Sequence, residues 1–386
     1  MIIYLLLFSF TLWGVFLFDL SRNTTYVSRQ RKTYYLYLSI FITLLSALRY
    51  RLGVDGLEYE DEFYPTVPSL HELFSQDYVL AEEPLWLLLC SVLKEFTNSF
   101  VLYQIVYSIV INSVLLSFIY RKCNYPFISV LIYLTYNYFY LNCELLRQGF
   151  AISIFLCIEP YLEKRAYSKY FMGSIIALFF HYSAFFLFIV PLIRNITLTH
   201  KNMLFTIVVA LFIAPIFAYM SSTDLYLLGI YFGDKFHVYA SRSEQAVFNT
   251  YSIITIVIPC ILLFLSSKHK RSVNKSDKYL LLYMFFLIIS PYFSMAKRIG
   301  IYFEIYYMVE TASYIGNRCL LISDKELRLV LFFPVLLLFT LNYYTWFGIK
   351  TFDGKHRQIV AVYPYSSIFS PEKDHARETS GWASLK

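Results

Sequence analysis

Two ionisable side chains lie within strongly apolar stretches of this sequence. Arg147 opens one apolar run, and His181 interrupts the next run along the chain. An arginine at membrane depth costs roughly 2.5–3.5 kcal/mol on insertion scales, so such residues usually serve a function. The pair therefore predicts a polar site within a membrane-embedded protein.

Further charged side chains are predicted to collect on the same face of the membrane as this pair. They are Arg49, Arg51, Asp55, Glu82, Glu83, Glu144 and Arg298. Several arginines that face a cavity suit an anionic ligand, because guanidinium groups match phosphate with paired hydrogen bonds. A carboxylate or a histidine nearby suits a general base that activates a hydroxyl nucleophile. Together these groups indicate displacement of a lipid pyrophosphate, with the arginines offsetting the charge of the leaving group.

Each of these residues also has a structural interpretation. Arg49, Arg51 and Arg298 suit helix ends, where their side chains would reach lipid head groups. Glu144 and Arg147 are three residues apart and would pair on one helix face. His181 would be a satisfied interior histidine, and the acidic residues 60–62 would form a solvated surface. The sequence leaves these alternatives open.

The composition indicates a membrane protein. The 386 residues are 58% hydrophobic and only 15% charged, against about 25% charged residues in soluble domains. The net charge of +7 does not indicate nucleic-acid binding, because the basic residues lie in short loops between apolar runs. The six cysteines form no metal-binding or disulfide pattern, and no P-loop is present. We therefore expect no metal and no cofactor.

Apolar runs of spanning or near-spanning length recur along the chain. They cover residues 1–20, 34–50, 99–120, 126–142, 146–162, 170–193, 202–220, 248–266, 278–296, 299–316 and 328–347. They predict an all-α polytopic membrane protein with about 11–13 transmembrane or half-membrane helices. Several runs are short, which indicates short or broken helices.

The charges between the runs predict a topology. The basic loop after the first run is expected on the cytoplasmic side, which places the acidic loop 51–98 outside, with an amphipathic helix near 84–96. The basic loop 266–278 is also expected to be cytoplasmic, which favours reading 170–193 as two half-helices hinged near His181 over a single span. This interpretation brings His181 level with Arg147 at the outer face.

The expected organisation is one transmembrane domain over residues 1–350, with a second outer loop at 221–247. Residues 351–386 are expected to form a polar tail on the outer side, and its low-hydrophobicity end is expected to be disordered.

Several separated motifs, in order along nearly the whole chain, resemble one bacterial family. They are Leu48-Arg49-Tyr50 followed by Gly53-Val54-Asp55 and Tyr59; Glu83-Pro84; Arg147-Gln148 with Ala151; Phe180-His181-Tyr182-Ser183-Ala184; Arg298 before Tyr302; and Pro364-Tyr365 with Phe369. In these features the sequence resembles the EpsG family, which is related to the Wzy-type polymerases of O-antigen and capsular polysaccharide.

The resemblance implies a GT-C-like membrane glycosyltransferase of the bacterial inner membrane, with its active site facing the periplasm. Such a protein moves a growing glycan from undecaprenyl pyrophosphate to the terminal sugar hydroxyl of another lipid-linked repeat unit. Arg147 and Arg298 would hold the pyrophosphate with help from Arg49, and His181 would position the acceptor or bind phosphate. Asp55, Glu83 or Glu144 would be the base. The implied partners are undecaprenyl-pyrophosphate-linked oligosaccharides and the lipid bilayer; a chain-length regulator protein is left open.

Three other functions fit parts of the sequence. A flippase or other transporter of the lipid-linked oligosaccharide would also carry charges in a cavity, but near the membrane midplane and repeated in two halves. A membrane acyltransferase that modifies the glycan also combines histidine with arginine. A non-catalytic subunit of an export complex would tolerate replacement of Arg147 and His181.

Overall fold

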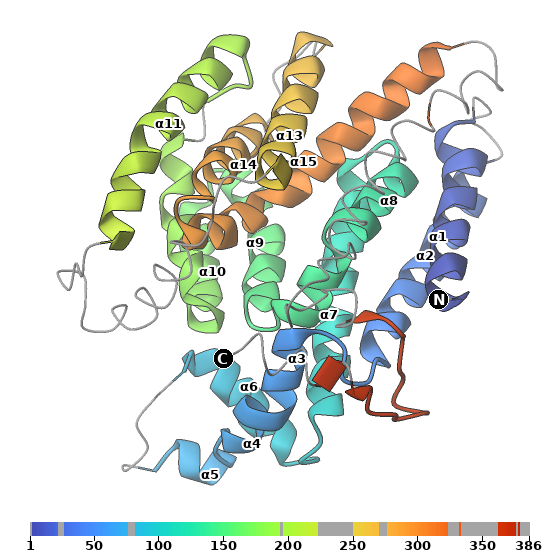
Figure 1. The fold of residues 1–386 in the computed structure, drawn as a ribbon, viewed down its shortest axis with the longest axis vertical. Helices are drawn as coiled ribbons and strands as arrows, with labels where there is room; N and C mark the ends of the chain where they lie inside the picture. The colour runs from blue at the N-terminus through green and yellow to red at the C-terminus, as the bar shows by residue number, and fades with distance from the viewer. Residues whose placement is uncertain are drawn as a thin grey trace. The chain divides into compact units, whose positions relative to one another are not determined.

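The computed structural model describes residues 2–21, 27–75, 82–193, 196–222, 250–269, 276–322, 332, 362–375 and 377–378. The regular elements in these ranges are helices (Figure 1). The chain divides into two compact units, which are Met1–Tyr182 with Ile315–Lys386, and Ser183–Tyr314. Most of the predicted outer loop 221–247 and of the apolar run 328–347 lies outside the described residues.

The first unit contains a set of long helices. They are α1 (Ile2–Gly14), which continues into the wide turn η1 (Val15–Asp19), α2 (Val27–Ala47), α7 (Phe100–Lys122), α8 (Pro126–Tyr136), α9 (Gln148–Glu163) and α10 (Tyr167–Phe180). Helix α2 packs against α7, α7 against α9, and α9 against α10. Within the described part of the chain, Ile2–Asp19 and Phe100–Lys122 are long and apolar enough to cross a membrane. The helices follow the predicted apolar runs, and the all-α prediction is confirmed.

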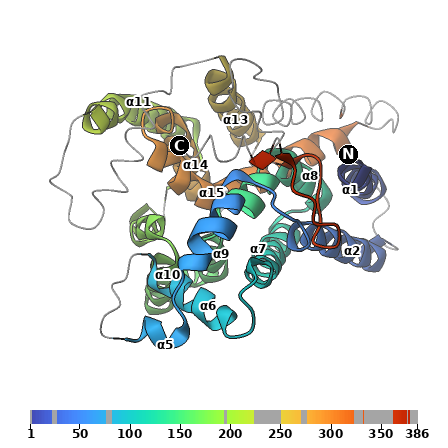
Figure 2. The same cartoon turned by 60° about the horizontal axis from the view of Figure 1, so that its bottom comes forward.

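Short helices gather at one end of this unit, at the bottom of Figure 1 and in front in Figure 2. They are α3 (Val54–Glu58), η2 (Tyr59–Phe63), α4 (Tyr64–Thr66), α5 (Leu70–Leu73) and α6 (Pro84–Lys94). The predicted amphipathic helix near 84–96 is confirmed as α6. Proline suits the first position of this helix because its missing N–H has no helical partner there.

One face of α6 is buried in the aromatic core of the unit. Trp86, Leu87, Cys90 and Leu93 recur with helical spacing and pack among other buried residues. The same core contains Phe150 of α9, and Phe180 at the end of α10 packs against it. The core therefore joins the short helices to the α9–α10 pair.

The predicted break near His181 is confirmed. Helix α10 ends at Phe180, His181 has extended backbone (φ −161°, ψ 127°), and the chain continues as the tight helical turn η4 (Tyr182–Phe188). Since α9 and α10 are joined by a short connection and pack together, the start of α9 and the end of α10 lie at the same end of the pair. The rings of Phe150 and Phe180 stack there with centroids 5.1 Å apart.

The second unit contains η5 (Val190–Ile193), α11 (His200–Ser222), α13 (Thr250–His269), α14 (Asp277–Ile289) and most of α15 (Ser294–Leu321). Its helices α14 and α15 meet through stacked tyrosines: Tyr279 lies on Tyr306 with ring centroids 4.2 Å apart, and Tyr283 on Tyr307 at 5.0 Å. Asp277, at the start of α14, accepts a hydrogen bond from the backbone N–H of Leu198 (3.0 Å). These contacts supply the partners that buried aromatic and carboxylate groups require.

Candidate functional site

Arg147 bonds to one tyrosine and two glutamates at the start of α9. Its Nε donates to the hydroxyl of Tyr59, and its Nη1 donates to the carboxylates of Glu82 and Glu83, the latter at 2.8 Å. Within the described chain, nothing accepts a hydrogen bond from the other terminal nitrogen, Nη2. The side chain is 15% exposed. Arg147 is therefore a held guanidinium that keeps one donor for a further acceptor.

Three aromatic rings surround the Arg147 guanidinium. Its central carbon lies 5.3 Å from the ring centre of Tyr59, 5.1 Å from that of Phe63 and 5.0 Å from that of Trp86. Aromatic faces attract a cation, more strongly where water is excluded. The rings and the carboxylates together fix both the position and the charge of Arg147.

A chain of hydrogen bonds connects this aromatic cage to the backbone beside Arg147. Trp86 Nε1 donates to the hydroxyl of Tyr103 (3.0 Å), which donates to the carbonyl of Leu146 (2.8 Å). Tyr107 approaches the next turn, and its hydroxyl lies 3.1 Å from the carbonyl oxygen of Leu145. It fits because residue 149 is glycine: a Cβ there would lie 2.8 Å from the Tyr107 ring. The start of α9 is thus held from two sides.

Asp55 and Glu144 form a carboxylate pair one turn away from this cage. The two carboxylate oxygens of Glu144 accept hydrogen bonds from the backbone N–H groups of Val54 (3.0 Å) and Asp55 (2.8 Å). Glu144 lies in the turn η3 (Tyr140–Glu144), between α8 and α9. Burial, followed by the neighbouring carboxylate of Asp55, raises the pKa of Glu144 to about 8. The pair therefore shares a proton near neutral pH.

Gly53 makes this close approach possible. Its φ of +91° is in the region that favours glycine. A Cβ at this position would lie 2.6 Å from Cys143 Cβ and 2.8 Å from the Cys143 carbonyl oxygen. A side chain here would push α3 away from Glu144.

The cage and the carboxylate pair are linked by one short helical segment. Asp55 and Tyr59 are four residues apart along α3 and η2, so they lie on one side of that segment. Asp55 meets Glu144 through its backbone, and Tyr59 meets Arg147 through its hydroxyl. The structure thus brings together the predicted site residues Asp55, Glu83, Glu144 and Arg147.

Glu144 and Arg147 do not pair on a helix face, as one interpretation of their spacing predicted. Glu144 binds the backbone of α3, whereas Arg147 binds Tyr59, Glu82 and Glu83. The reason is that η3 ends at Glu144 and α9 begins at Gln148, so no single helix carries both residues.

Arg49 lies in a buried polar network. It is 2% exposed, and its Nη1 donates to the carbonyl of Ser46 (2.6 Å) and approaches the hydroxyl of Ser108 (3.3 Å). The hydroxyl of Ser46 also donates to Asn142 (2.7 Å), two residues before Glu144. Among the described residues, Arg49 Nη2 has no hydrogen-bond partner. Arg49 therefore supports η3 and retains a buried, unused donor.

The positions of His181 and Arg298 follow from the helices that carry or precede them. His181 follows α10 at the end that packs against the aromatic core, and it is partly buried. Arg298 lies in the first turns of α15, within the second unit, and its predicted role rests on the sequence.

The sequence interpretation missed several residues that hold the site. Arg51 was interpreted as a helix-end marker and Asp61 as part of a solvated surface, yet they form a hydrogen-bonded ion pair at 2.5 and 2.7 Å. Tyr59 stands in one of the sequence motifs without a predicted role, and no sequence pattern gave Trp86 a role. A local signal existed only for Tyr59, which lies one helical turn after Asp55.

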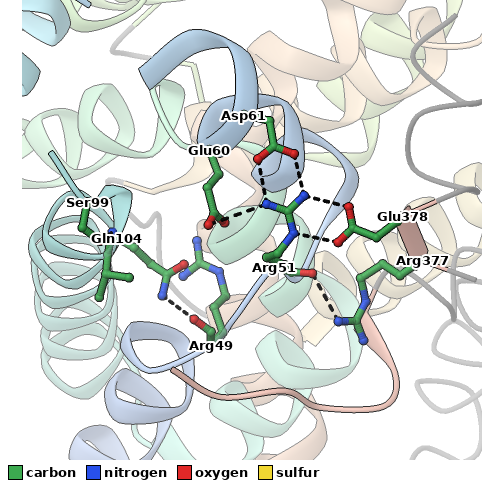
Figure 3. A network of polar contacts seen from close by, with 9 residues as sticks. Arg49, Arg51, Glu60, Asp61, Ser99, Gln104, Arg377 and Glu378 are labelled. Atoms are coloured by element: carbon green, nitrogen blue, oxygen red, sulfur yellow. Dashed lines mark hydrogen bonds and ion pairs between the residues drawn. The ribbon is translucent and has the colours of Figure 1, made fainter. Parts of the chain in front are cut away.

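The predicted disorder at the end of the tail is wrong for residues 377 and 378. Arg377 is 1% exposed, and Glu378 accepts from Arg51 at 2.6 and 2.7 Å (Figure 3). The prediction relied on low hydrophobicity, whereas this part of the tail is held by charge pairing.

Comparison of the sequence with known proteins and families finds a match to one family model. No curated protein matches the chain, and no solved structure matches it. The sequence model of the EpsG family matches residues 32–367, which includes every residue of the candidate site. This match covers most of the chain, which confirms the resemblance: the protein belongs to the EpsG family, and so to a polysaccharide-polymerase type of membrane protein.

Proposed function

We propose that the protein is a polysaccharide repeat-unit polymerase of the bacterial inner membrane. It transfers a growing glycan from undecaprenyl pyrophosphate to a sugar hydroxyl of the next lipid-linked repeat unit, at the periplasmic face. The observation that carries the proposal is the Asp55–Glu144 pair beside Arg147, within a chain of this family. The carboxylate pair can bind and release a proton, and Arg147 supplies positive charge.

Asp55 is the proposed base. Glu83 is 3% exposed and already paired with Arg147, and both oxygens of Glu144 are held by backbone N–H groups. The pair shares one proton near neutral pH, and we assign the base to Asp55 because both oxygens of Glu144 accept backbone hydrogen bonds. Asp55 therefore suits the removal of a proton from the acceptor hydroxyl. Glu83 then serves to hold Arg147, and Glu144 serves to hold α3.

In the proposed reaction the acceptor oxygen attacks the anomeric carbon of the donor glycan. A new glycosidic C–O bond forms, the bond to the pyrophosphate oxygen breaks, and the acceptor proton passes to Asp55. Arg147 Nη2 donates to the departing pyrophosphate, because Tyr59, Glu82 and Glu83 hold the rest of the guanidinium in place. Arg49 and Arg298 are proposed as further cations for the phosphates, and His181 as the group that orients the acceptor.

Reconstitution tests this proposal against a flippase. The full-length protein in liposomes is given an undecaprenyl-pyrophosphate-linked repeat unit, and the glycan length and the released lipid pyrophosphate are measured. A polymerase yields a ladder of lengths with one lipid pyrophosphate released for each bond formed. Movement of unchanged substrate across the bilayer, without lengthening, would establish a flippase instead. In cells, a deletion strain should carry single repeat units without a ladder; loss of all surface repeats would contradict the proposal.

A further inference from the structure

The C-terminal tail lies along the segment that follows α2. The backbone N–H of Tyr50 donates to the carbonyl of Ser366 (2.9 Å), and the N–H of Ile368 donates to the carbonyl of Leu48 (3.0 Å). The Tyr365 hydroxyl donates to the carbonyl of Leu45 (3.1 Å). These bonds join residues more than 300 positions apart, so the end of the chain is attached beside the candidate site.

A charge cluster fastens the last described residues of the tail. Figure 3 shows the Arg51 guanidinium between the carboxylates of Asp61 and Glu378. Glu378 receives two hydrogen bonds from Arg51, at 2.6 and 2.7 Å. A carboxylate oxygen of Glu60 lies 3.6 Å from Nη1 of Arg51. Hydrogen bonds to Asp61 and Glu378 raise the pKa of Arg51 above its ordinary value, which keeps it charged. The side chain of Arg51 is only 3% exposed, so these partners replace its lost water.

Arg377 holds the backbone of the same residue. Its Nη1 donates to the Arg51 carbonyl (3.2 Å), and its Nη2 donates to the carbonyl of Pro364. Arg51 has a φ of +50°, which residues other than glycine rarely adopt. The tail thus grips both the side chain and the carbonyl of Arg51, and so fixes a strained point of the chain.

The gripped segment contains the candidate catalytic residue. Arg51 precedes Gly53 and α3, and its partner Asp61 lies in η2 beyond Tyr59. Asp55 and Tyr59 lie between these two attachment points. A shift of Arg51 would therefore move α3 relative to Glu144, and η2 relative to Arg147.

We propose that Glu378 and Arg377 are positioning residues for the glycosyl transfer. They lock the 51–61 segment so that Asp55 faces the acceptor and Tyr59 holds Arg147. This inference rests on the proposed function. The EpsG family match ends at residue 367, so the match itself gives no role to these two side chains.

The test compares two glutamines on the same tail in the full-length reconstituted protein. Glu378→Gln keeps the shape of the side chain but removes the charge that faces Arg51. Glu372→Gln is the matched control, because Glu372 is exposed and lies six residues earlier. Hydrogen–deuterium exchange of residues 54–61 measures how well the backbone amides of the segment are protected, without reference to activity. Initial rates at varied concentrations of lipid-linked donor separate kcat from KM.

We expect Glu378→Gln to lower kcat by about tenfold or more, since a misplacement of about 1 Å at reacting groups costs up to roughly 100-fold. KM for the donor should change little, and exchange over residues 54–61 should become faster. Glu378→Asp should recover part of kcat, and Glu372→Gln should match the wild type. An active wild type with an equally active Glu378→Gln variant overturns the positioning role alone, whatever the exchange. A wild type that joins no repeat units overturns the proposed function and this inference with it.

Discussion

The carboxylate of Glu144 accepts a hydrogen bond of 2.8 Å from the backbone N–H of Asp55. The two residues are 89 positions apart, and the bond holds the start of α3 against the turn between α8 and α9. It places two carboxyl groups together, three residues from Arg147. The proposed acid–base and phosphate-binding chemistry therefore shares one rigid support.

Removal of the Arg147 guanidinium should abolish long glycan. Arg147→Ala deletes the donor at Nη2 and leaves Glu82 and Glu83 without their cation. Loss of one such donor costs roughly 100- to 1,000-fold in kcat. Arg121→Ala is the control, because Arg121 is exposed at the end of α7 and its Nε donates to the carbonyl of Ser117 in the same helix. Glycan length and membrane content are measured together; a normal ladder in Arg147→Ala would remove Arg147 from the site.

The hydroxyl of Tyr59 should matter more than the ring of Phe63. Tyr59→Phe keeps an aromatic face beside the guanidinium but removes the acceptor of Arg147 Nε. A hydrogen bond to a charged group contributes about 1.5–3 kcal/mol, whereas an aromatic face contributes about 0.5–2 kcal/mol. The rate of polymerisation should therefore fall further in Tyr59→Phe than in Phe63→Leu. The reverse order would show that the cage acts through its rings.

The pH dependence should carry the signature of Glu144. Its pKa rises from an ordinary value of 4.5 to about 8 in the folded protein, through burial and then Asp55. The folded chain thus keeps a proton that the unfolded chain loses, so this group's contribution to stability falls as pH rises from 4.5 to about 8. Loss of the same proton should lower kcat on the alkaline side. Rates measured from pH 5 to 9.5 should show this limb in the wild type and not in Glu144→Gln; persistence of the limb would assign it to another group.

Two glycines of the same loop should respond in opposite directions. Gly53→Ala adds a Cβ at 2.6 Å from Cys143 Cβ and forces alanine to a φ of +91°, which should cost about 1–3 kcal/mol of folding stability. Gly56→Ala is the control, because its Cβ would lie 3.4 Å from the Cys143 carbonyl, within α3, where alanine favours the helix by about 1 kcal/mol. In detergent, the midpoint temperature of thermal unfolding should fall below the wild-type value for Gly53→Ala and should not fall for Gly56→Ala. Equal midpoints would contradict the close approach of α3 to η3.

Local patterns in the sequence predicted much of the fold. The amphipathic pattern of residues 84–96 predicted a short helix, and the structure has α6 at Pro84–Lys94. The charge balance of the loops predicted a break near His181, and α10 ends at Phe180. Both signals are local, because helical period and loop charge are properties of neighbouring residues.

The partners of the charged residues were harder to predict. Arg51 and Glu378 are separated by 327 positions, and nothing in either local sequence specifies the other. Residues 51–61 have the composition of a solvated loop, yet they form α3 and η2 because Glu144 and the tail bind them. Ion pairs of this kind depend on the tertiary fold and leave no periodic signal.

The central claim is that Asp55 removes the acceptor proton in a polymerase. The direct measurement is the rate of glycan lengthening by reconstituted Asp55→Asn, with Glu62→Gln as the control because Glu62 is exposed on the same helical segment. We expect a ladder from the wild type and from Glu62→Gln, and single repeat units from Asp55→Asn at equal protein content and thermal stability. A ladder from Asp55→Asn at the rate of Glu62→Gln would contradict the claim.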